Sequence, residues 1–345
     1  MDQRVRPGPQ EIRRARSENP KMRERDLAAQ LGISEVELVA AHCGDGVRRL
    51  EPRVNDLLKG LEAVGEVMAL TRNESAVHET IGVYDKVVTG DHSAMALGRD
   101  IDLRIFPKVW AHGFAVEKRG EGEVRHSLQF FDKAGDAVHK IHLRASSNLY
   151  AYQKLVGELL SADQNPGIEV IAADRAEPAE IGEVDIADLR ARWSRLKDVH
   201  EFFGMLRTLK LERRRALHLV GEDYAWRLAD GAIATMLDQA VAQELPIMCF
   251  VGSGGCVQIH SGPVQNIKPM GPWLNVLDET FHLHLRLDHI HEVWGVRKPT
   301  GEGHVTSLEA YDAAGRLIIQ FFGERHEGEP ELADWRALAE GLPRP

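Results

Sequence analysis

The chain has 345 residues, 43% apolar and 28% charged, a composition and length that predict a globular protein with two domains or two repeats. Its formal net charge of −10 argues against a nucleic-acid partner, because phosphate contacts need clustered cations. Three cysteines without a CxxC pair argue against a disulfide framework or zinc knuckle, and no apolar run approaches the ~20 residues that would insert into a membrane.

The first half of the chain predicts helices followed by strands. No apolar segment follows the basic residues at the N-terminus, so we expect no secretory signal and a cytoplasmic protein. Apolar residues recur at helical intervals over 23–42 and 53–64. Six later stretches read as strands, with a Gly-containing hairpin turn at DKAG (132–135). These stretches are 67–70, 76–88, 101–106, 110–118, 126–132 and 137–145.

The second half opens on DVHEFFGMLRTLKLERRR (198–215). Asp198 followed by Glu201 resembles a capping box, which predicts a helix that begins at Asp198 with His200 in its first turn. The positive end of a helix disfavours an imidazolium there, and a neutral imidazole can ligate a metal. Phe203 lies on the same predicted helix face, and three arginines (213–215) open the next helix.

Strands follow these helices in the second half as well. IMCFVGSGGCVQIHSG (247–262) predicts strand, turn and strand, and GSGG within it is interpreted as a hairpin turn because it does not open a helix, as a phosphate loop would. A second Gly-containing turn is expected at DAAG (312–315). The remaining predicted strands are 280–287, 291–299, 306–312 and 316–324.

The two halves are similar at a constant offset of 180 residues, without a gap over roughly eighty residues. SLQFFDKAG from Ser127 matches SLEAYDAAG from Ser307, and Lys118 matches Lys298. We therefore predict an N-terminal repeat (1–160), a linker (161–182) and a C-terminal repeat (183–345) that carries the main site. The expected fold class is α+β: a tandem duplication of a module with helices and a large antiparallel β-sheet, the two sheets packed in one molecule.

Two other patterns suggest different functions. RDLAAQLGISEVEL (25–38) resembles a helix-turn-helix, but Glu35 and Glu37 stand where cations would face phosphates, which favours a structural helical hairpin. FHLHLRLDHIH places His282 and His284 on one strand face, yet no Asp, Glu or Cys at convincing spacing completes a zinc site.

A third pattern combines a histidine, aromatic side chains and arginines. Arg104 and Phe106 share a strand face in IDLRIF, which suits a flat apolar ligand with a polar end but also an arginine at a sheet edge. His200, Phe203 and the arginines after them form a set that haem needs, since iron takes an imidazole and propionates take cations. A half-buried histidine near a helix start explains the same residues without a ligand.

The chain resembles the HemS/HmuS-type family of haemin-degrading factors and cytoplasmic haem-transport proteins. The resemblance covers nearly the whole chain except the first dozen residues and the linker. It rests on RDLAAQLGISEVEL (25–38), IDLRIF (101–106), DVHEFFGML (198–206), GSGGCVQIHSGPVQNIKPMGPWLNVLDETFHLHL (252–285), VRKPTGEGHVTSLEAYDAAG (296–315) and QFFGERHEGEPE (320–331).

The resemblance implies a haem site with an axial histidine. His200 matches the family's ligand to the haem iron, and Arg104 matches an arginine on the opposite side, the catalytic hydrogen-bond donor if the protein is an enzyme. Phe322 stands where some relatives have Tyr, and it cannot donate the hydrogen bond of a hydroxyl. The residues implied to bind haem b are His200, Arg104, Phe106, Arg213, Lys298, Gln320 and Arg325.

The resemblance also implies a role in haem uptake and iron utilisation. The protein would deliver haem or degrade it as an oxygenase-type enzyme, and both alternatives stay open because one histidine ligand with an open position opposite serves either. Expected partners are haem, a haem-uptake transporter, a haem oxygenase or an electron-donating reductase. Lesser alternatives are a haem-responsive helix-turn-helix regulator and a second haem site in the first repeat, with His78, His92 or His112 as candidates.

Overall fold

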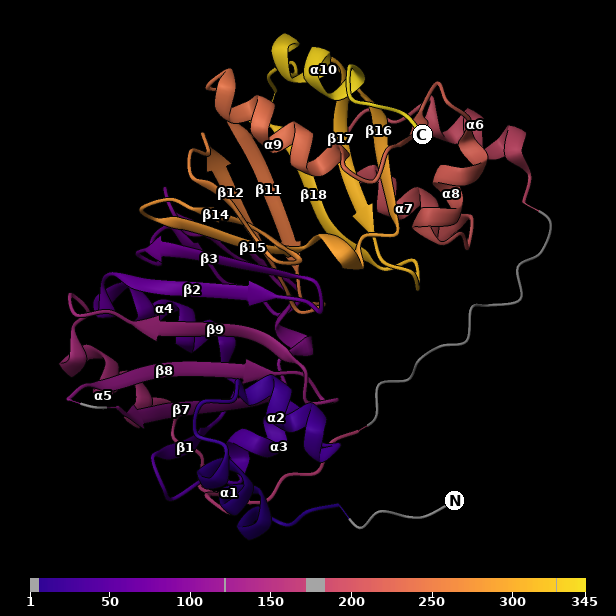
Figure 1. Ribbon diagram of the computed structural model, residues 1–345. Coiled ribbons are helices and arrows are strands. Elements are labelled where there is room, and N and C mark those ends of the chain that lie inside the picture. Colours follow the sequence, from indigo (N-terminus) through magenta and orange to yellow (C-terminus); the bar gives the residue numbers. More distant parts are fainter. Residues whose placement is uncertain (1–5, 121, 172–183, 327) are drawn as a thin grey trace. The chain divides into compact units, whose positions relative to one another are not determined.

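The computed structural model describes residues 6–120, 122–171, 184–326 and 328–345 (Figure 1). Within these residues most helices precede most strands in both halves, as the sequence predicts, but one strand precedes the fourth helix of each half and one helix follows its last strand. The helices of the first half are α1 (Pro9–Glu18), α2 (Glu24–Leu31), α3 (Glu35–Ala40), α4 (Val54–Val64) and α5 (Leu149–Leu159). Its strands are β1 (Val47–Leu50), β2 (Val67–Arg72), β3 (Ala76–Gly82), β4 (Val87–Val88), β5 (Ala94–Leu97), β6 (Asp102–Ile105), β7 (His112–Arg119), β8 (Val124–Phe131) and β9 (Ala137–Leu143).

The second half repeats this series of elements. Its helices are α6 (Ile186–Trp193), α7 (Glu201–Thr208), α8 (Arg213–Val220), α9 (Ala232–Ala242) and α10 (Ala333–Glu340). Its strands are β10 (Ala225–Leu228), β11 (Ile247–Gly252), β12 (Cys256–Gly262), β13 (Ile267–Met270), β14 (Trp273–Leu277), β15 (Phe281–Arg286), β16 (Glu292–Thr300), β17 (Gly303–Tyr311) and β18 (Leu317–Gly323).

The strands form two nine-stranded sheets. One has the order β1-β7-β8-β9-β2-β3-β15-β14-β13, and the other has the order β10-β16-β17-β18-β11-β12-β6-β5-β4. The prediction of an α+β fold with antiparallel sheets is confirmed.

Strand registers confirm the tandem duplication. Val116 pairs with Ser127 in the first half, and Val296 pairs with Ser307 in the second, again 180 residues on. The register also shifts at equivalent points, between Phe130 and Phe131 and between Ala310 and Tyr311. Two copies of one module therefore share side-chain positions on their sheets.

The chain divides into two compact units: residues 1–72, 79–175 and 252–258 form the first, and 73–78, 176–251 and 259–345 form the second. The predicted linker, 161–182, lies outside the described residues from 172 onward.

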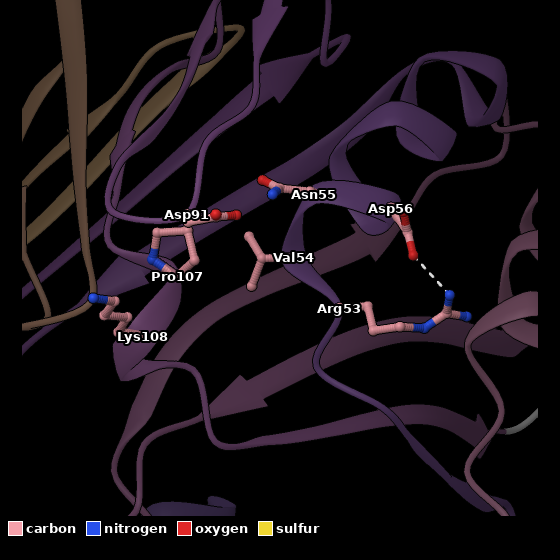
Figure 2. A pocket seen from close by; sticks show the side chains of 7 residues that line it. All are labelled: Arg53, Val54, Asn55, Asp56, Asp91, Pro107 and Lys108. Atoms are coloured by element: carbon pink, nitrogen blue, oxygen red, sulfur yellow. Dashed lines mark hydrogen bonds and ion pairs between the residues drawn. The ribbon is translucent and has the colours of Figure 1, made fainter.

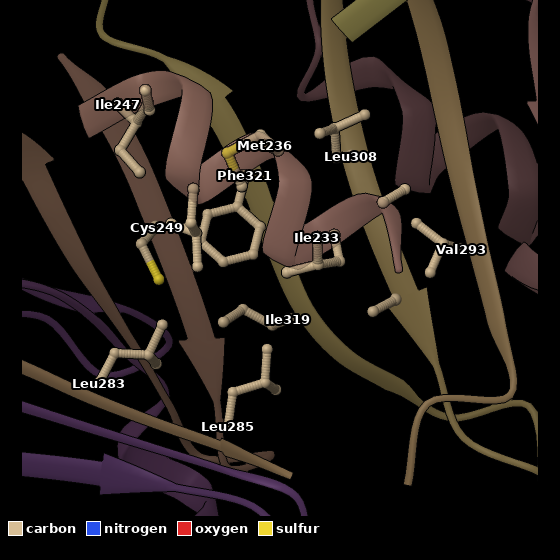
Figure 3. Close-up of a cluster of buried hydrophobic side chains, with 14 of the residues drawn as sticks. Ile233, Met236, Ile247, Cys249, Leu283, Leu285, Val293, Leu308, Ile319 and Phe321 are labelled. Carbon is tan, nitrogen blue, oxygen red and sulfur yellow. The ribbon is translucent and has the colours of Figure 1, made fainter. Parts of the chain in front are cut away.

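Two hydrophobic layers enclose the strands β16 to β18 of the second unit. On one face, Ile233 and Met236 of α9 pack with Leu308 and Phe321 (Figure 3). Side chains alternate along a strand, so the neighbouring residues Trp294, Val296 and Tyr311 face the other way and pack with α6, α7 and α8. Each large apolar side chain buried in this way contributes roughly 1.5–3 kcal/mol. The packing fixes α7 and α8 over this second sheet face.

The structure corrects the predicted orientation of the first helical hairpin. Helices α2 and α3 form as expected, but Glu35 does not face solvent: it is 8% exposed and forms ion pairs with Arg72 and Lys140. Glu37 accepts a hydrogen bond from the backbone N–H of Ser34 at the start of α3. The carboxylates of this hairpin thus stabilise the fold, which supports its interpretation as a structural element.

Candidate functional site

A buried polar cluster lies between the second copy's sheet and helix α8. Glu309 of β17 is fully buried, and Ser307 and Tyr311 point to the same side of that strand. The Glu309 carboxylate accepts every hydrogen bond of the cluster described next. The donors are Arg213 Nε at 2.8 Å, Lys298 Nζ at 3.0 Å, Gln320 Nε2 at 3.1 Å, Ser307 Oγ at 2.9 Å and Tyr311 Oη at 2.6 Å.

The cations keep Glu309 ionised. Burial alone would raise the pKa of Glu309, but Arg213 first and Lys298 second hold that pKa well below its ordinary value. Burial lowers the pKa of Lys298 to about 8, against the opposing effect of Glu309. Below that pH the two cations and one carboxylate leave one net positive charge in the cluster.

Aromatic rings from α7 and β18 cover the cations of the cluster. The Arg213 guanidinium carbon lies 5.1 Å from the Phe202 ring centroid and 5.3 Å from that of Phe203. Lys298 Nζ lies 5.0 Å from the Phe202 centroid and 5.7 Å from that of Phe322. Phe202 is buried, whereas Phe203 is 58% exposed. An exposed apolar ring thus adjoins buried positive charge.

His200 lies immediately before α7, and the prediction that a helix begins at Asp198 is wrong. Asp198 does not cap the helix: its Oδ1 accepts the His200 backbone N–H at 2.8 Å and contacts His200 Nδ1 at 2.6 Å. The hydrogen bond from the His200 backbone is the largest cause that lowers the pKa of Asp198. An ionised carboxylate only accepts, so the ring proton lies on Nδ1. Nε2, the other ring nitrogen, has no partner among the hydrogen bonds of the described residues, and the side chain is 84% exposed.

The five candidate residues of the second copy fall into two groups. They are His200, Arg213, Lys298, Gln320 and Arg325. Arg213, Lys298 and Gln320 share Glu309. The charge of Arg325 makes the smallest of the contributions that lower the pKa of Asp198, the residue that contacts His200. Phe202 and Phe203, two and three residues after His200, are the rings that cover Arg213.

Arg104 and Phe106 form a separate pair in the first unit. Leu103 and Ile105 are buried while Arg104 and Phe106 are each about two-fifths exposed, so the two point to one face as predicted. Arg104 Nη1 forms an ion pair with Asp102. Burial raises the pKa of Asp102 although Arg104 opposes the change. The guanidinium is thus oriented by a carboxylate of its own strand.

A cavity of about 390 Å³ lies in the first unit and contains none of the predicted site residues (Figure 2). The start of α4 lines it through residues 53–56, together with Asp91, Pro107 and Lys108. Arg53 Nη1 and Asp56 Oδ2 are 2.7 Å apart, so two of the charges along its wall pair with each other.

The other histidines of the predicted sites have different surroundings. His284 Nδ1 lies 2.6 Å from Asn275 Oδ1, and the described residues contain no group of three or more His, Cys, Asp or Glu arranged to hold a metal. The zinc alternative thus has no support in this part of the chain. His78 is fully buried with its ring edge on Phe281, and burial lowers the pKa of His112. None of the described helices is long and apolar enough to cross a bilayer.

Sequence reasoning missed Glu309, Ser307 and Tyr311. The alternation in SLEAY does place Ser307, Glu309 and Tyr311 on one strand face. It cannot reveal that helices cover that face, so the pattern alone is typical of an exposed strand. The one available signal was the 180-residue match, in which Glu309 replaces the neutral Gln129.

Comparison with known proteins gives matches along most of the chain. It is 38% identical over 328 residues to "Hemin transport protein HmuS" of Yersinia pestis, covering 95% of this chain and 94% of that protein. It is 39% identical to "Hemin transport protein HemS" of Yersinia enterocolitica, covering 93% of each.

Solved structures agree with these matches. Holo-PhuS, a heme-binding protein from Pseudomonas aeruginosa, has a TM-score of 0.95 at 42% identity and covers 98% of this chain and 100% of its own. ChuS, a heme degrading enzyme from Escherichia coli O157:H7, has a TM-score of 0.90 at 35% identity, covering 97% and 100%. The family model described as "Haemin-degrading HemS.ChuX domain" matches residues 32–159 and again 210–342. This chain therefore belongs to the HemS/ChuX family and carries its domain twice.

Proposed function

We propose that this protein binds one haem b in its second copy, with His200 as the axial ligand of the haem iron. The observation that carries the proposal is the exposed imidazole of His200, whose Nδ1 contacts Asp198 and whose Nε2 is left for a metal. Histidines that ligate metals commonly donate their second ring N–H to a carboxylate in this way.

The surroundings of His200 suit the remainder of a haem. Phe203 offers exposed aromatic surface to a porphyrin. The net positive charge shared by Arg213, Lys298 and Glu309 suits propionates, with Gln320 and Arg325 as further contacts. The similarity to haemin transport proteins and to a haem-binding structure supports the same ligand.

The proposed role is the handling of imported haem in the cytoplasm, where the protein delivers haem or degrades it to release iron. A haem-uptake transporter would supply haem. A haem oxygenase would receive it, or an electron-donating reductase would support its degradation by this chain. Arg104, with Phe106 beside it, is proposed on the opposite side of the haem, where its guanidinium would donate a hydrogen bond to bound water or oxygen and would be the catalytic group if haem is degraded.

Haemin titration tests this function directly. We predict saturation at one haemin per chain, with a Soret band shifted from that of free haemin, because the proposed site has one axial histidine, His200, held by Asp198. Absence of saturable binding would contradict the proposal.

Adding an enzymatic reductant with catalase to the haem complex separates the two roles. Release of iron and an open tetrapyrrole indicates an enzyme, whereas intact haem that moves to an acceptor protein indicates a carrier.

Arg104→Ala tests the second side of the site. We predict that it changes the absorption spectra of water and hydroxide complexes across pH, while haemin affinity falls by less than ~5-fold, the effect of about 1 kcal/mol. The exposed Arg99 of the same unit is the matched control, and Arg99→Ala should leave these spectra as in the wild type. Identical pH-dependent spectra in Arg104→Ala and the wild type would exclude the proposed contact.

A further inference from the structure

We propose that Glu309 is a positioning residue of the haem site: its buried carboxylate holds Arg213, Lys298 and Gln320 in place to receive the propionates before haem arrives. The inference rests on the proposed function and deepens it, because it adds a residue that need not touch the ligand. A carboxylate beside a site for propionates repels those propionates. The presence of Glu309 there therefore needs another explanation.

Glu309 holds the Arg213 guanidinium by one edge. Arg213 Nε donates to Oε2 at 2.8 Å and Nη2 donates to Oε1, so the carboxylate meets the guanidinium in the bidentate arrangement that fixes its plane. Tyr311 Oη adds a contact to the same Nε at 3.1 Å. The bonds described use Nε and Nη2, which leaves Nη1, the third nitrogen, as the donor that would meet a propionate. A planar donor fixed in this way loses less conformational freedom when it binds.

Glu309 also keeps Lys298 charged. Lys298 is 3% exposed, and burial lowers its pKa to about 8. The charged groups that act on it are Glu309 of β17, which raises the pKa, and Arg213 of α8, which lowers it. From α7 the Phe202 ring contacts it, and from β18 the Phe322 ring does. Without the carboxylate, burial and Arg213 would both favour the neutral amine near neutral pH.

Loss of the Glu309 charge would therefore leave the net charge almost unchanged. The native cluster has two cations and one anion, and a variant with a neutral residue at 309 and a neutral Lys298 has Arg213 alone. Both arrangements carry one positive charge at a pH between the lowered Lys298 pKa of the variant and the Lys298 pKa of the wild type. A change in haem affinity would thus report the placement of the donors and not the total charge.

The first copy contains the same kind of contact with the charges exchanged. The first residue of α3 is Glu35, and it pairs with Lys140 of β9, the position equivalent to Gln320. The first residue of α8 is Arg213, and it pairs with Glu309 of β17. Both pairs are buried and both join a helix start to a sheet. A purely structural Glu309 would therefore behave as Glu35 does.

The two copies differ at the helix that comes before each of these pairs, α2 in the first copy and α7 in the second. The residue directly before α7 is His200, and the corresponding residue directly before α2 is Arg23, which offers no imidazole. The Glu35 pair therefore holds a helix on its sheet without a neighbouring candidate ligand for iron. This makes Glu35→Gln the matched control for Glu309→Gln.

The experiment is haemin titration of the full chain between pH 6 and 10, with circular dichroism to verify folding. Wild-type affinity should fall above about pH 8 as Lys298 loses its proton. Glu309→Gln should keep the Soret position set by His200, bind haemin ~10-fold more weakly, which corresponds to one charge-assisted hydrogen bond, and show its alkaline loss at lower pH. Glu35→Gln should match the wild type in affinity and in pH profile.

Two results would overturn the proposal: a wild-type affinity and pH profile in Glu309→Gln, or an equal loss of affinity in both variants. Should Glu309→Gln not fold, Glu309→Asp keeps the charge but withdraws the carboxylate by one methylene. It should weaken haemin binding and retain the wild-type alkaline midpoint, and unchanged affinity would refute the positioning role. If the wild type itself bound no haemin, the proposed function would fail. Wild-type binding that depends on His200 but not on Glu309 would remove only this inference.

Discussion

Replacing His200 with alanine is expected to weaken haemin binding by more than ~100-fold and to move the Soret band toward that of free haemin. Loss of a partner that merely orients a metal ligand typically costs 10–100-fold, so loss of the ligand itself should exceed that range. The protein should keep its stability, because the His200 side chain is 84% exposed and its side-chain hydrogen bond is to Asp198 in the adjacent turn. Absorption titration with haemin and circular dichroism measure the two effects.

His291→Ala is the control for this variant. His291 is an exposed histidine of the same unit, and its backbone N–H, which alanine retains, donates to Tyr311 O at 2.8 Å. Haemin affinity should be unchanged in that protein. If His200→Ala kept the wild-type spectrum and affinity, the ligand to iron would have to be another residue, and the proposed site would be wrong.

Replacing Arg213 with methionine is expected to lower the free energy of unfolding by about 3–5 kcal/mol, the usual cost of removing one partner of a buried ion pair. Methionine fills much of the same volume, but Glu309 would lose its bidentate partner and keep the single hydrogen bond from the Lys298 ammonium. Urea denaturation of the ligand-free protein measures the loss. A cation that only binds the ligand would not change the free energy of unfolding of the ligand-free protein, so this measurement separates the two roles.

Arg215→Met is the matched control, since Arg215 lies in the same first turn of α8 and has no side-chain partner among the contacts of the described residues. It should change the free energy of unfolding by less than ~0.5 kcal/mol. Equal effects of the two substitutions would show that Arg213 does not stabilise Glu309.

Acidification adds a second measurement for Arg213. The pKa of Glu309 in the folded protein lies well below its ordinary value of 4.5, so its contribution to stability is complete above pH 4.5 and is lost as the pH falls below it. Without Arg213 the folded pKa rises, and the part of the acid-induced loss that comes from Glu309 should shrink. A steeper loss in Arg213→Met than in the wild type would contradict this account.

Local patterns predicted the elements well where one local interaction decides the structure. Strand periodicity and Gly-containing turns predicted most strands of both halves but missed β1, β5, β10, β13 and β14. GSGG is a hairpin turn in which Ser253 N donates to Cys256 O at 2.9 Å. The prediction that a helix begins at Asp198 is wrong because the Asp198 carboxylate is bound by two groups of His200. That carboxylate accepts the backbone N–H and ring N–H of His200, two residues on, instead of capping the helix.

The burial of Glu35 shows why charged positions were harder to predict. In the sequence, Glu35 is a carboxylate at a helix start, which suggests solvent. Its partners Arg72 and Lys140 are 37 and 105 residues away, and they lower its pKa to about 2 although burial opposes the change. A charge pattern within one helix contains no information about cations that distant strands bring to it.

Sequence patterns alone established the α+β class, the duplication at 180 residues, and His200 and Arg213 as candidates at consecutive helix starts. Those features depend on spacing along the chain or on similarity between its halves. Only the tertiary structure decided that Glu309 joins Arg213, Lys298 and Gln320, and that Asp198 orients His200. Arg213 and Glu309 are 96 residues apart, and their contact requires the strand register and the packing of α8 on the sheet. Long-range packing sets such contacts, so neither segment alone contains the information that predicts them.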